Sequence, residues 1–286
     1  MVVSALENQK TAAGAQAIAP WTVPLTQRVP QLLPHPVAVG GNILGGATKS
    51  RWIDTDAFTP SDLEADQCRM LDQETLPTGL SYKFYAFDEA LGQCTGGPAS
   101  VCISGSSGTT HLRVDFPGCA VQDFKIAIAA PWNALPRRPR IIKDHRPYLP
   151  IVGKFLEDQG HKQLTIFISS IHGIDLDGDG KEEFVINTQS RKELPEDRSA
   201  KDYSMVLLVR STNGRNEAIA IDEGRWTQEH QGDFEDFPDV RYADVNGDGI
   251  MEIVVDWRSS AEFATRVYTL KDGKPVATGL GFYEGD

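Results

Sequence analysis

Two glycine-rich segments of this chain carry oxygen-bearing side chains at the same spacing. Acidic or amide residues occupy the first, third, fifth and ninth positions of each segment: Asp175, Asp177, Asp179 and Glu183 in the first, and Asp244, Asn246, Asp248 and Glu252 in the second. Hard cations such as Ca²⁺ take about 6–8 oxygen ligands at roughly 2.3–2.6 Å, and alternate residues of a tightly turning loop supply them. The sequence therefore predicts two calcium sites.

The seventh position of each loop adds a backbone ligand to this prediction, the carbonyl oxygen of Lys181 or of Ile250. Glycines at the fourth and sixth positions permit the positive φ angles of such a turn. Carboxylates this close together repel one another unless a cation lies between them. Because the first loop has four acidic ligands and the second has three plus Asn246, we expect the first loop to bind calcium more tightly.

Two other interpretations of these loops are an EF-hand and an ordinary hairpin turn. An EF-hand needs a bidentate Glu at position twelve and flanking helices. Position twelve is Ile186 in the first loop and Val255 in the second, and both lie in β-branched runs typical of strands. Asp-Gly and Asn-Gly also form simple hairpin turns. The same four-ligand spacing in both loops favours metal binding.

The pattern D-x-[DN]-G-D-G-x-x-E, followed by an apolar strand, resembles the FG-GAP/VCBS-type repeat of alpha-integrin propellers and many secreted bacterial proteins. The resemblance covers roughly residues 160–286. It implies that each loop binds calcium and leads into a strand of a propeller blade.

Strand patterns surround both loops in the same order. Asp244 follows Asp175 by 69 residues, and after each loop a hairpin pattern turns at Asn213-Gly214 or Asp272-Gly273. Strand, loop, strand and hairpin make a four-stranded unit of blade size, which needs neighbours to bury its faces. We predict an all-β fold with blade-like four-stranded repeats over residues 151–286, arranged as a partial or small propeller or as a β-sandwich.

The remainder of the chain divides into two further predicted regions. Residues 1–60 contain many prolines and are predicted to form an extended or flexible N-terminal arm. Their glycine-rich stretch is not a phosphate-binding P-loop, because Ala47 stands where Lys must follow the second Gly. Residues 61–150 are predicted to be a small β-rich segment, with strands at 82–87, 111–116 and 124–129.

Four cysteines lie in the first half of the chain: Cys68, Cys94, Cys102 and Cys119. Without a C-x-x-C pair, a zinc ribbon or thioredoxin-type site is disfavoured. Two disulfides are expected, with three possible connectivities; a local Cys94–Cys102 bridge would leave Cys68 with Cys119. Four buried free thiols are the alternative. Disulfides would place the protein in an oxidising compartment.

The formal net charge of −12 disfavours wholesale binding to nucleic acid or to an anionic membrane. No apolar run reaches the roughly 18 residues that suggest a membrane span. The N-terminus lacks the basic start and apolar stretch of a signal peptide. Since the predicted sites suit calcium of the extracellular kind, we expect a mature chain that is secreted or periplasmic.

No residue pattern points to catalysis. The six histidines lack H-E-x-x-H spacing, and His172 is expected to pack beside the first loop. Two carboxylates about 5–10 Å apart would suit glycoside hydrolysis. The sequence gives no way to choose such a pair that the predicted calcium sites do not already explain. Trp226 and Trp257 either line a sugar site or pack in the core. The basic cluster at 137–146 is predicted to be a solvated loop.

The sequence therefore favours an exported calcium-binding β-repeat protein that acts as a protein- or glycan-binding module, in which calcium is structural. One alternative is a periplasmic inhibitor or immunity-type protein that caps one partner, with the insert at 192–203 in the contact surface. A secreted hydrolase with structural calcium is the other.

Overall fold

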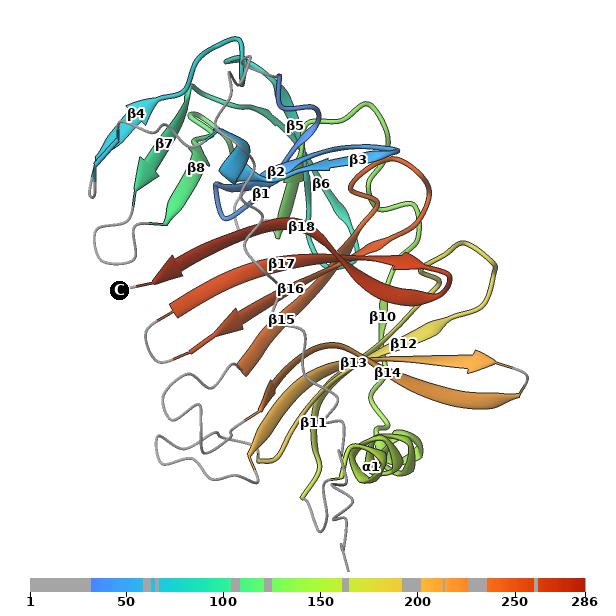
Figure 1. Cartoon of the computed structure of the whole chain (residues 1–286). Helices are drawn as coiled ribbons and strands as arrows, with labels where there is room; N and C mark the ends of the chain where they lie inside the picture. Colours follow the sequence, from blue (N-terminus) through green and yellow to red (C-terminus); the bar gives the residue numbers. More distant parts are fainter. Residues whose placement is uncertain are drawn as a thin grey trace, which may run out of the picture.

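The computed structural model describes residues 32–58, 63–64, 67–103, 109–120, 125–160, 165–191, 202–212, 214–225, 236–259 and 262–285. Within these residues the predicted all-β class is confirmed: three antiparallel sheets form the molecule, and none of them closes on itself (Figure 1). Long runs of β-branched and aromatic residues, broken by Gly and Asp at the turns, account for the strands.

The first sheet has nine strands in the order β4-β7-β8-β2-β1-β9-β5-β6, with β3 paired to β2. Its strands come from the first 128 residues: β1 Pro36–Val39, β2 Asn42–Thr48, β3 Arg51–Ile53, β4 Cys68–Met70, β5 Ser81–Tyr85, β6 Ala90–Thr95, β7 Ala99–Ile103, β8 Thr110–Val114 and β9 Ile126–Ile128. A short 3-10 helix, η1 (Thr55–Phe58), follows β3. The strands expected at 82–87, 111–116 and 124–129 are present as β5, β8 and β9.

The extended arm predicted for residues 1–60 is wrong for its last part. Strands β1 and β2 lie in the middle of the nine-stranded sheet, and Val37 and Leu44 are fully buried. Pro36 is tolerated because it is the first residue of its strand, where only its carbonyl is needed and accepts the Ala129 N–H at 3.0 Å. The prediction gave weight to the many prolines and overlooked the short apolar hairpin that β1 and β2 form. Residues 1–31 lie outside the described part of the chain.

Both expected disulfides form, but the local pairing is wrong. The bonds join Cys68 to Cys102 and Cys94 to Cys119. Cys68 and Cys102 face each other directly across the β4–β7 ladder. Cys94 lies on β6, at the other end of the strand order, so its nearness to Cys102 in sequence does not bring the two thiols together.

The second and third sheets are meanders in which consecutive strands pair. The second runs β10-β11-β12-β13-β14 and the third β15-β16-β17-β18. Their strands are β10 Arg140–Ile141, β11 Phe167–Ile174, β12 Glu183–Gln189, β13 Tyr203–Thr212, β14 Arg215–Arg225, β15 Asp236–Ala243, β16 Glu252–Arg258, β17 Glu262–Lys271 and β18 Lys274–Gly285. The acidic loops join β11 to β12 and β15 to β16, so the predicted order of strand, loop, strand and hairpin is present in both sheets.

One helical segment was not expected from the sequence. The 3-10 helix η2 (Arg146–Tyr148) leads into α1 (Leu149–Asp158), with a proline in the first turn of α1. Val152 and Leu156 are buried in a cluster with Ile171 and Tyr203 of the second sheet. In the described part of the chain, no helix is long and apolar enough to cross a membrane.

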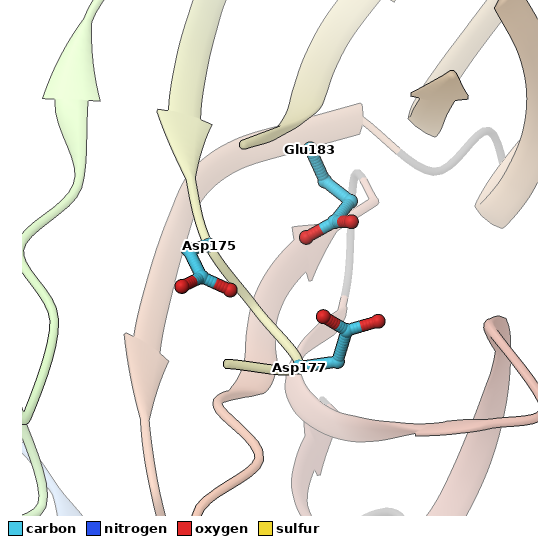
Figure 2. Close-up of side chains that lie close together, drawn as sticks. All are labelled: Asp175, Asp177 and Glu183. Carbon is cyan, nitrogen blue, oxygen red and sulfur yellow. The ribbon is translucent and has the colours of Figure 1, made fainter. Parts of the chain in front are cut away.

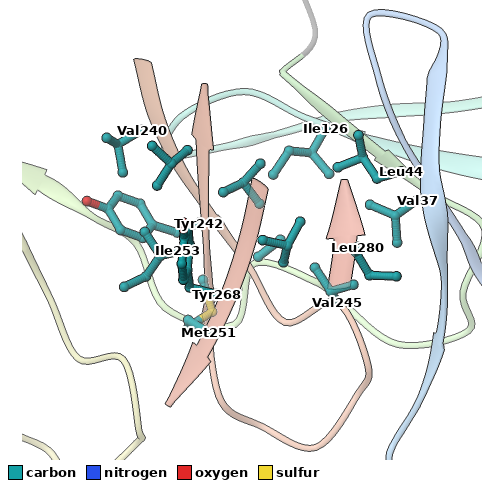
Figure 3. Packing of buried hydrophobic residues seen from close by; sticks show 14 of the residues in the cluster. Val37, Leu44, Ile126, Val240, Tyr242, Val245, Met251, Ile253, Tyr268 and Leu280 are labelled. Carbon is teal, nitrogen blue, oxygen red and sulfur yellow. The ribbon is translucent and has the colours of Figure 1, made fainter. Parts of the chain in front are cut away.

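The largest apolar core draws on all three sheets. Figure 3 shows the part of it that the first and third sheets contribute. Val37 and Ile126 come from the first sheet, Val185 from the second, and Val240 and Leu280 from the third. The regions predicted as 61–150 and 151–286 therefore share a core. This sharing holds the two acidic loops in place relative to the rest of the molecule.

Candidate metal centre

The first acidic loop gathers three carboxylates at the mouth of the β11–β12 hairpin. Figure 2 shows the side chains of Asp175, Asp177 and Glu183, which lie close together. Their ligand atoms lie within 4.8 Å of one another. Asp175 directly follows β11, and Glu183 opens β12 opposite Ile174. Among the described His, Cys, Asp and Glu side chains, this is the only group of three that meets this distance. Three carboxylates this close together could hold a metal ion.

Backbone hydrogen bonds hold this loop in shape. The two carboxylate oxygens of Asp175 accept the N–H groups of Gly178 at 2.7 Å and Gly180 at 3.2 Å. Both glycines have positive φ, 77° and 85°, as predicted. Glu183 Oε2 accepts the Leu176 N–H at 2.9 Å. Each carboxylate oxygen has further lone pairs for a cation.

A guanidinium already contacts this acidic group. Arg210 Nη2 lies 2.7 Å from Asp177 Oδ2, and Arg210 Nε lies 3.4 Å from Glu183 Oε1. Two predicted ligand residues pair with each other, since Asp179 Oδ1 accepts the Lys181 N–H at 2.8 Å and the Lys181 ammonium lies 3.2 Å from Oδ2. These bonds lower the pKa of Asp179. A metal ion in the first loop must share its oxygens with Arg210.

The second loop repeats the hydrogen bonds of the first. Asp244 accepts the N–H groups of Gly247 at 2.7 Å and Gly249 at 3.1 Å. Glu252 Oε2 accepts the Val245 N–H at 2.7 Å, as Glu183 accepts that of Leu176. These are the same roles at the same loop positions.

The remaining predicted ligands of the second loop form a chain of local hydrogen bonds. Asn246 Oδ1 accepts the Asp248 N–H at 2.9 Å, and Asp248 Oδ1 accepts the Ile250 N–H at 2.8 Å. Asn246 stands where the first loop has Asp177, so the second loop has one carboxylate fewer. The carbonyl ligands expected from Lys181 and Ile250 stay a prediction.

The two loops differ in what balances their charge. Glu252 is fully buried, and its Oε1 accepts the hydroxyl of Thr269 at 2.9 Å. Thr269 of β17 has the same position relative to Glu252 as Arg210 of β13 has relative to Glu183. Burial raises the pKa of Glu252 to about 8 and also raises the pKa of Asp244. No ion pair between described residues involves either carboxylate.

Arg137 belongs to neither loop but forms hydrogen bonds with both of them. Its guanidinium donates to the carbonyl oxygens of Asp175 at 2.5 Å, Leu176 at 3.0 Å and Gly249 at 2.6 Å. The Met251 N–H also donates to the Leu176 carbonyl, at 2.8 Å. The loops therefore lie side by side. The prediction of a solvated basic loop at 137–146 is wrong for Arg137, because three backbone acceptors surround its head group.

Trp132 makes a second link to the second loop. Its indole N–H donates to the Asp244 carbonyl at 2.8 Å. Its ring packs on Gly247, where an added Cβ would lie 2.8 Å from Trp132 Cδ2. Gly247 is therefore required by its positive φ of 78° and by this close approach. Neither Trp132 nor Arg137 was singled out by the sequence as a loop contact, since both precede the loops by tens of residues.

His172 lies on β11, three residues before Asp175, and its ring contacts Tyr242 and Phe87. Its Nδ1 lies 2.9 Å from the Tyr242 hydroxyl, and the Phe87 ring approaches it edge-on at 4.7 Å. Burial lowers the pKa of His172 to about 4, so the ring is neutral near pH 7. Trp226 and most of the insert at 192–203 lie outside the described residues.

No family model, no curated protein and no solved structure matches this chain.

Proposed function

We propose that this chain binds Ca²⁺ at both acidic loops, and that the bound ions order a β scaffold which binds a protein or glycan partner. The observation that carries the proposal is the matching hydrogen-bond pattern of the two loops around carboxylates that converge or are buried. We also propose that the second and third sheets, which carry these loops, are FG-GAP/VCBS-type blades.

The donor chemistry favours calcium over other metals. All side-chain ligands are carboxylate or amide oxygens, which suit hard cations, and neither loop contains His or Cys. An ionised carboxylate buried without a cation is costly, and for this reason burial raises the pKa of Glu252, which is completely buried. A divalent ion between Asp244, Asn246 and Glu252 would offset that cost.

Two disulfides support the proposal that the protein works in an oxidising compartment, secreted or periplasmic. Calcium in such compartments is abundant enough for sites of modest affinity, which bind at roughly 10⁻⁴–10⁻³ M. Loops on a rigid β scaffold are a common place for partner binding.

Arg210 changes the order of affinity expected from counting acidic residues alone. The first loop has four acidic side chains, but Arg210 and Lys181 bring two positive charges to it. The second loop has three acidic side chains, and no described cation forms an ion pair with them; Arg137 contacts only backbone carbonyl oxygens, in both loops alike. We therefore propose that calcium fills the second loop first, because there it displaces no ion pair.

The test is thermal unfolding and calorimetric titration of the non-reduced protein, with millimolar calcium and with excess chelator. We expect calcium to raise the unfolding midpoint by several degrees, through its preference for the folded state. Asp244→Asn should remove the tighter of two binding events and Asp175→Asn the weaker. Asp158→Asn, which changes an exposed carboxylate on α1, is the matched control. An unchanged midpoint in calcium would overturn the proposal.

A further inference from the structure

An open cavity of about 870 Å³ lies between the first and third sheets, away from the acidic loops. One wall comes from η1 and β8, and the other from β16, β17 and β18. The volume is within the range of roughly 300–1,000 Å³ that small-molecule sites occupy.

The third sheet is shaped locally to form this cavity. Along β17 and β18 the pairing passes from Arg266 with Gly281 to Tyr268 with Ala277, so that three residues of β18 oppose one of β17. Gly279, within this bulge, has a φ of 85°. Three of the six lining residues of β18 are small, Ala277, Gly279 and Gly281, and they alternate with the larger Leu280, Phe282 and Tyr283 towards the end of the strand. Bulges bend a strand and redirect its side chains next to binding sites.

The cavity is lined by hydrogen-bonding groups as well as aromatic rings. Asp54, Thr110 and Arg266 provide carboxylate, hydroxyl and guanidinium groups, and Tyr283 provides a half-buried ring. Trp257 also lines the cavity and is 4% exposed, and its indole N–H has no hydrogen-bond partner among the described residues.

The charges around the cavity disfavour an anionic ligand. Arg266 forms an ion pair with Asp222 at 3.0 Å, and its guanidinium lies 4.6 Å from the centre of the Trp257 ring. Asp54 adds a further carboxylate, and the chain as a whole carries a net charge of −12. An anionic ligand would therefore meet a repulsive potential.

We propose that this cavity binds a short neutral glycan, of one to three sugar units. Sugar hydroxyls both donate and accept hydrogen bonds, which matches the mixture of carboxylate, hydroxyl and guanidinium groups, and the C–H face of a sugar packs on an aromatic ring such as Tyr283. The proposal rests on the binding-module part of the proposed function and names its ligand class. It does not depend on calcium.

The test is saturation-transfer NMR on the full chain in calcium, with maltotriose, cellotriose, mannotriose and chitotriose as neutral probes and trigalacturonic acid as the anionic probe. Ala277→Trp fills the cavity from an exposed position of β18. Val276→Trp is its control, because the neighbouring residue points to the opposite face of the strand and is 42% exposed. Tyr283→Leu removes the aromatic ring.

We expect at least one neutral trisaccharide to bind, with affinity about tenfold or more weaker in Ala277→Trp and Tyr283→Leu and unchanged in Val276→Trp. The proposal is overturned if no neutral probe binds, if only trigalacturonic acid binds, or if binding persists in Ala277→Trp. A calcium titration of the same samples separates the two proposals. A calcium effect without sugar binding removes only the glycan site, and sugar binding without a calcium effect removes only the metal sites.

Discussion

Arg137 shows how a single side chain from outside the acidic loops determines their arrangement. Its guanidinium is shared by carbonyl oxygens of both loops, and Leu176 additionally accepts the Met251 N–H. Bonds from a charged donor to backbone acceptors are stronger than neutral ones. Arg137 therefore stabilises the contact between the second and third sheets at the loop end.

We predict that Arg137→Met lowers the free energy of unfolding by about 1.5–3 kcal/mol, because three carbonyl oxygens lose a charged donor. Arg138→Met is the matched control, since the neighbouring Arg138 is exposed, and it should change the value by no more than about 0.5 kcal/mol. Urea unfolding followed by tryptophan fluorescence measures both. Equal effects of the two substitutions would show that Arg137 does not hold the loops.

His172 makes stability depend on pH. Its folded-state pKa of about 4 is below the ordinary value of 6.5, so between these values the unfolded chain binds a proton that the folded protein does not. Stability contributed by neutral His172 is therefore present above pH 6.5 and lost as the pH falls towards 4, by up to about 3 kcal/mol.

The measurement is urea unfolding in chelator between pH 7 and pH 4.5, for the native chain and for His172→Gln. We expect the difference between the two curves to shrink as the pH falls, because glutamine does not titrate. Comparing the two proteins cancels the opposite effect of Glu252, whose raised pKa favours the folded state at lower pH. Parallel curves would contradict the assignment to His172.

At the scale of elements, helix α1 is held by two apolar residues on one face. Val152 is 0% exposed and Leu156 is 2% exposed, both against the second sheet. The helix is short, so most of its stability comes from this packing. Its ion pair between Lys154 and Asp158 is exposed and contributes little.

We predict that Leu156→Ala lowers the free energy of unfolding by about 2–4 kcal/mol through loss of burial and creation of a cavity. Leu149→Ala in the same helix should change it by about 0.5 kcal/mol or less, because Leu149 is 38% exposed. Chemical unfolding followed by far-UV circular dichroism gives both values. A small effect of Leu156→Ala would mean that α1 is not part of the cooperative core.

At the scale of the molecule, the first and third sheets dock through a close contact at Gly45 of β2. A Cβ at this position would lie 2.4 Å from the Ile53 carbonyl oxygen and 2.5 Å from Leu280 Cδ2 on β18. Leu280 belongs to the core that all three sheets share. Only glycine allows β2 and β18 to approach this closely.

We predict that Gly45→Ala lowers the free energy of unfolding by about 3 kcal/mol or more, from backbone strain at a φ of 137° together with the steric clash. Gly40→Ala is the control, because Gly40 also has positive φ, 57°, but nothing within 4 Å of an added Cβ. It should cost only about 1–2 kcal/mol. Calorimetry at matched calcium would measure both, and equal losses would exclude the packing contribution.

The sequence alone was sufficient for the all-β class, for most of the strands and for the glycines of the two acidic loops. These features depend on residues near one another in the chain, such as the continuous apolar run Met205–Val209 of β13 and the Asp-Gly pairs that turn after Asp175 and Asp244. Local backbone preference and local hydrogen bonding determine them, so spacing is enough to predict them.

Only the tertiary structure decided which distant residues meet. Arg137 reaches Gly249 across 112 residues, Cys94 pairs with Cys119, and Gly45 packs against Leu280. It also placed a guanidinium at the first loop and a hydroxyl at the second, a difference that the ligand spacing does not contain. The reason is physical: these contacts depend on strand pairing and on how sheets pack over a shared core, and many arrangements satisfy the same local pattern.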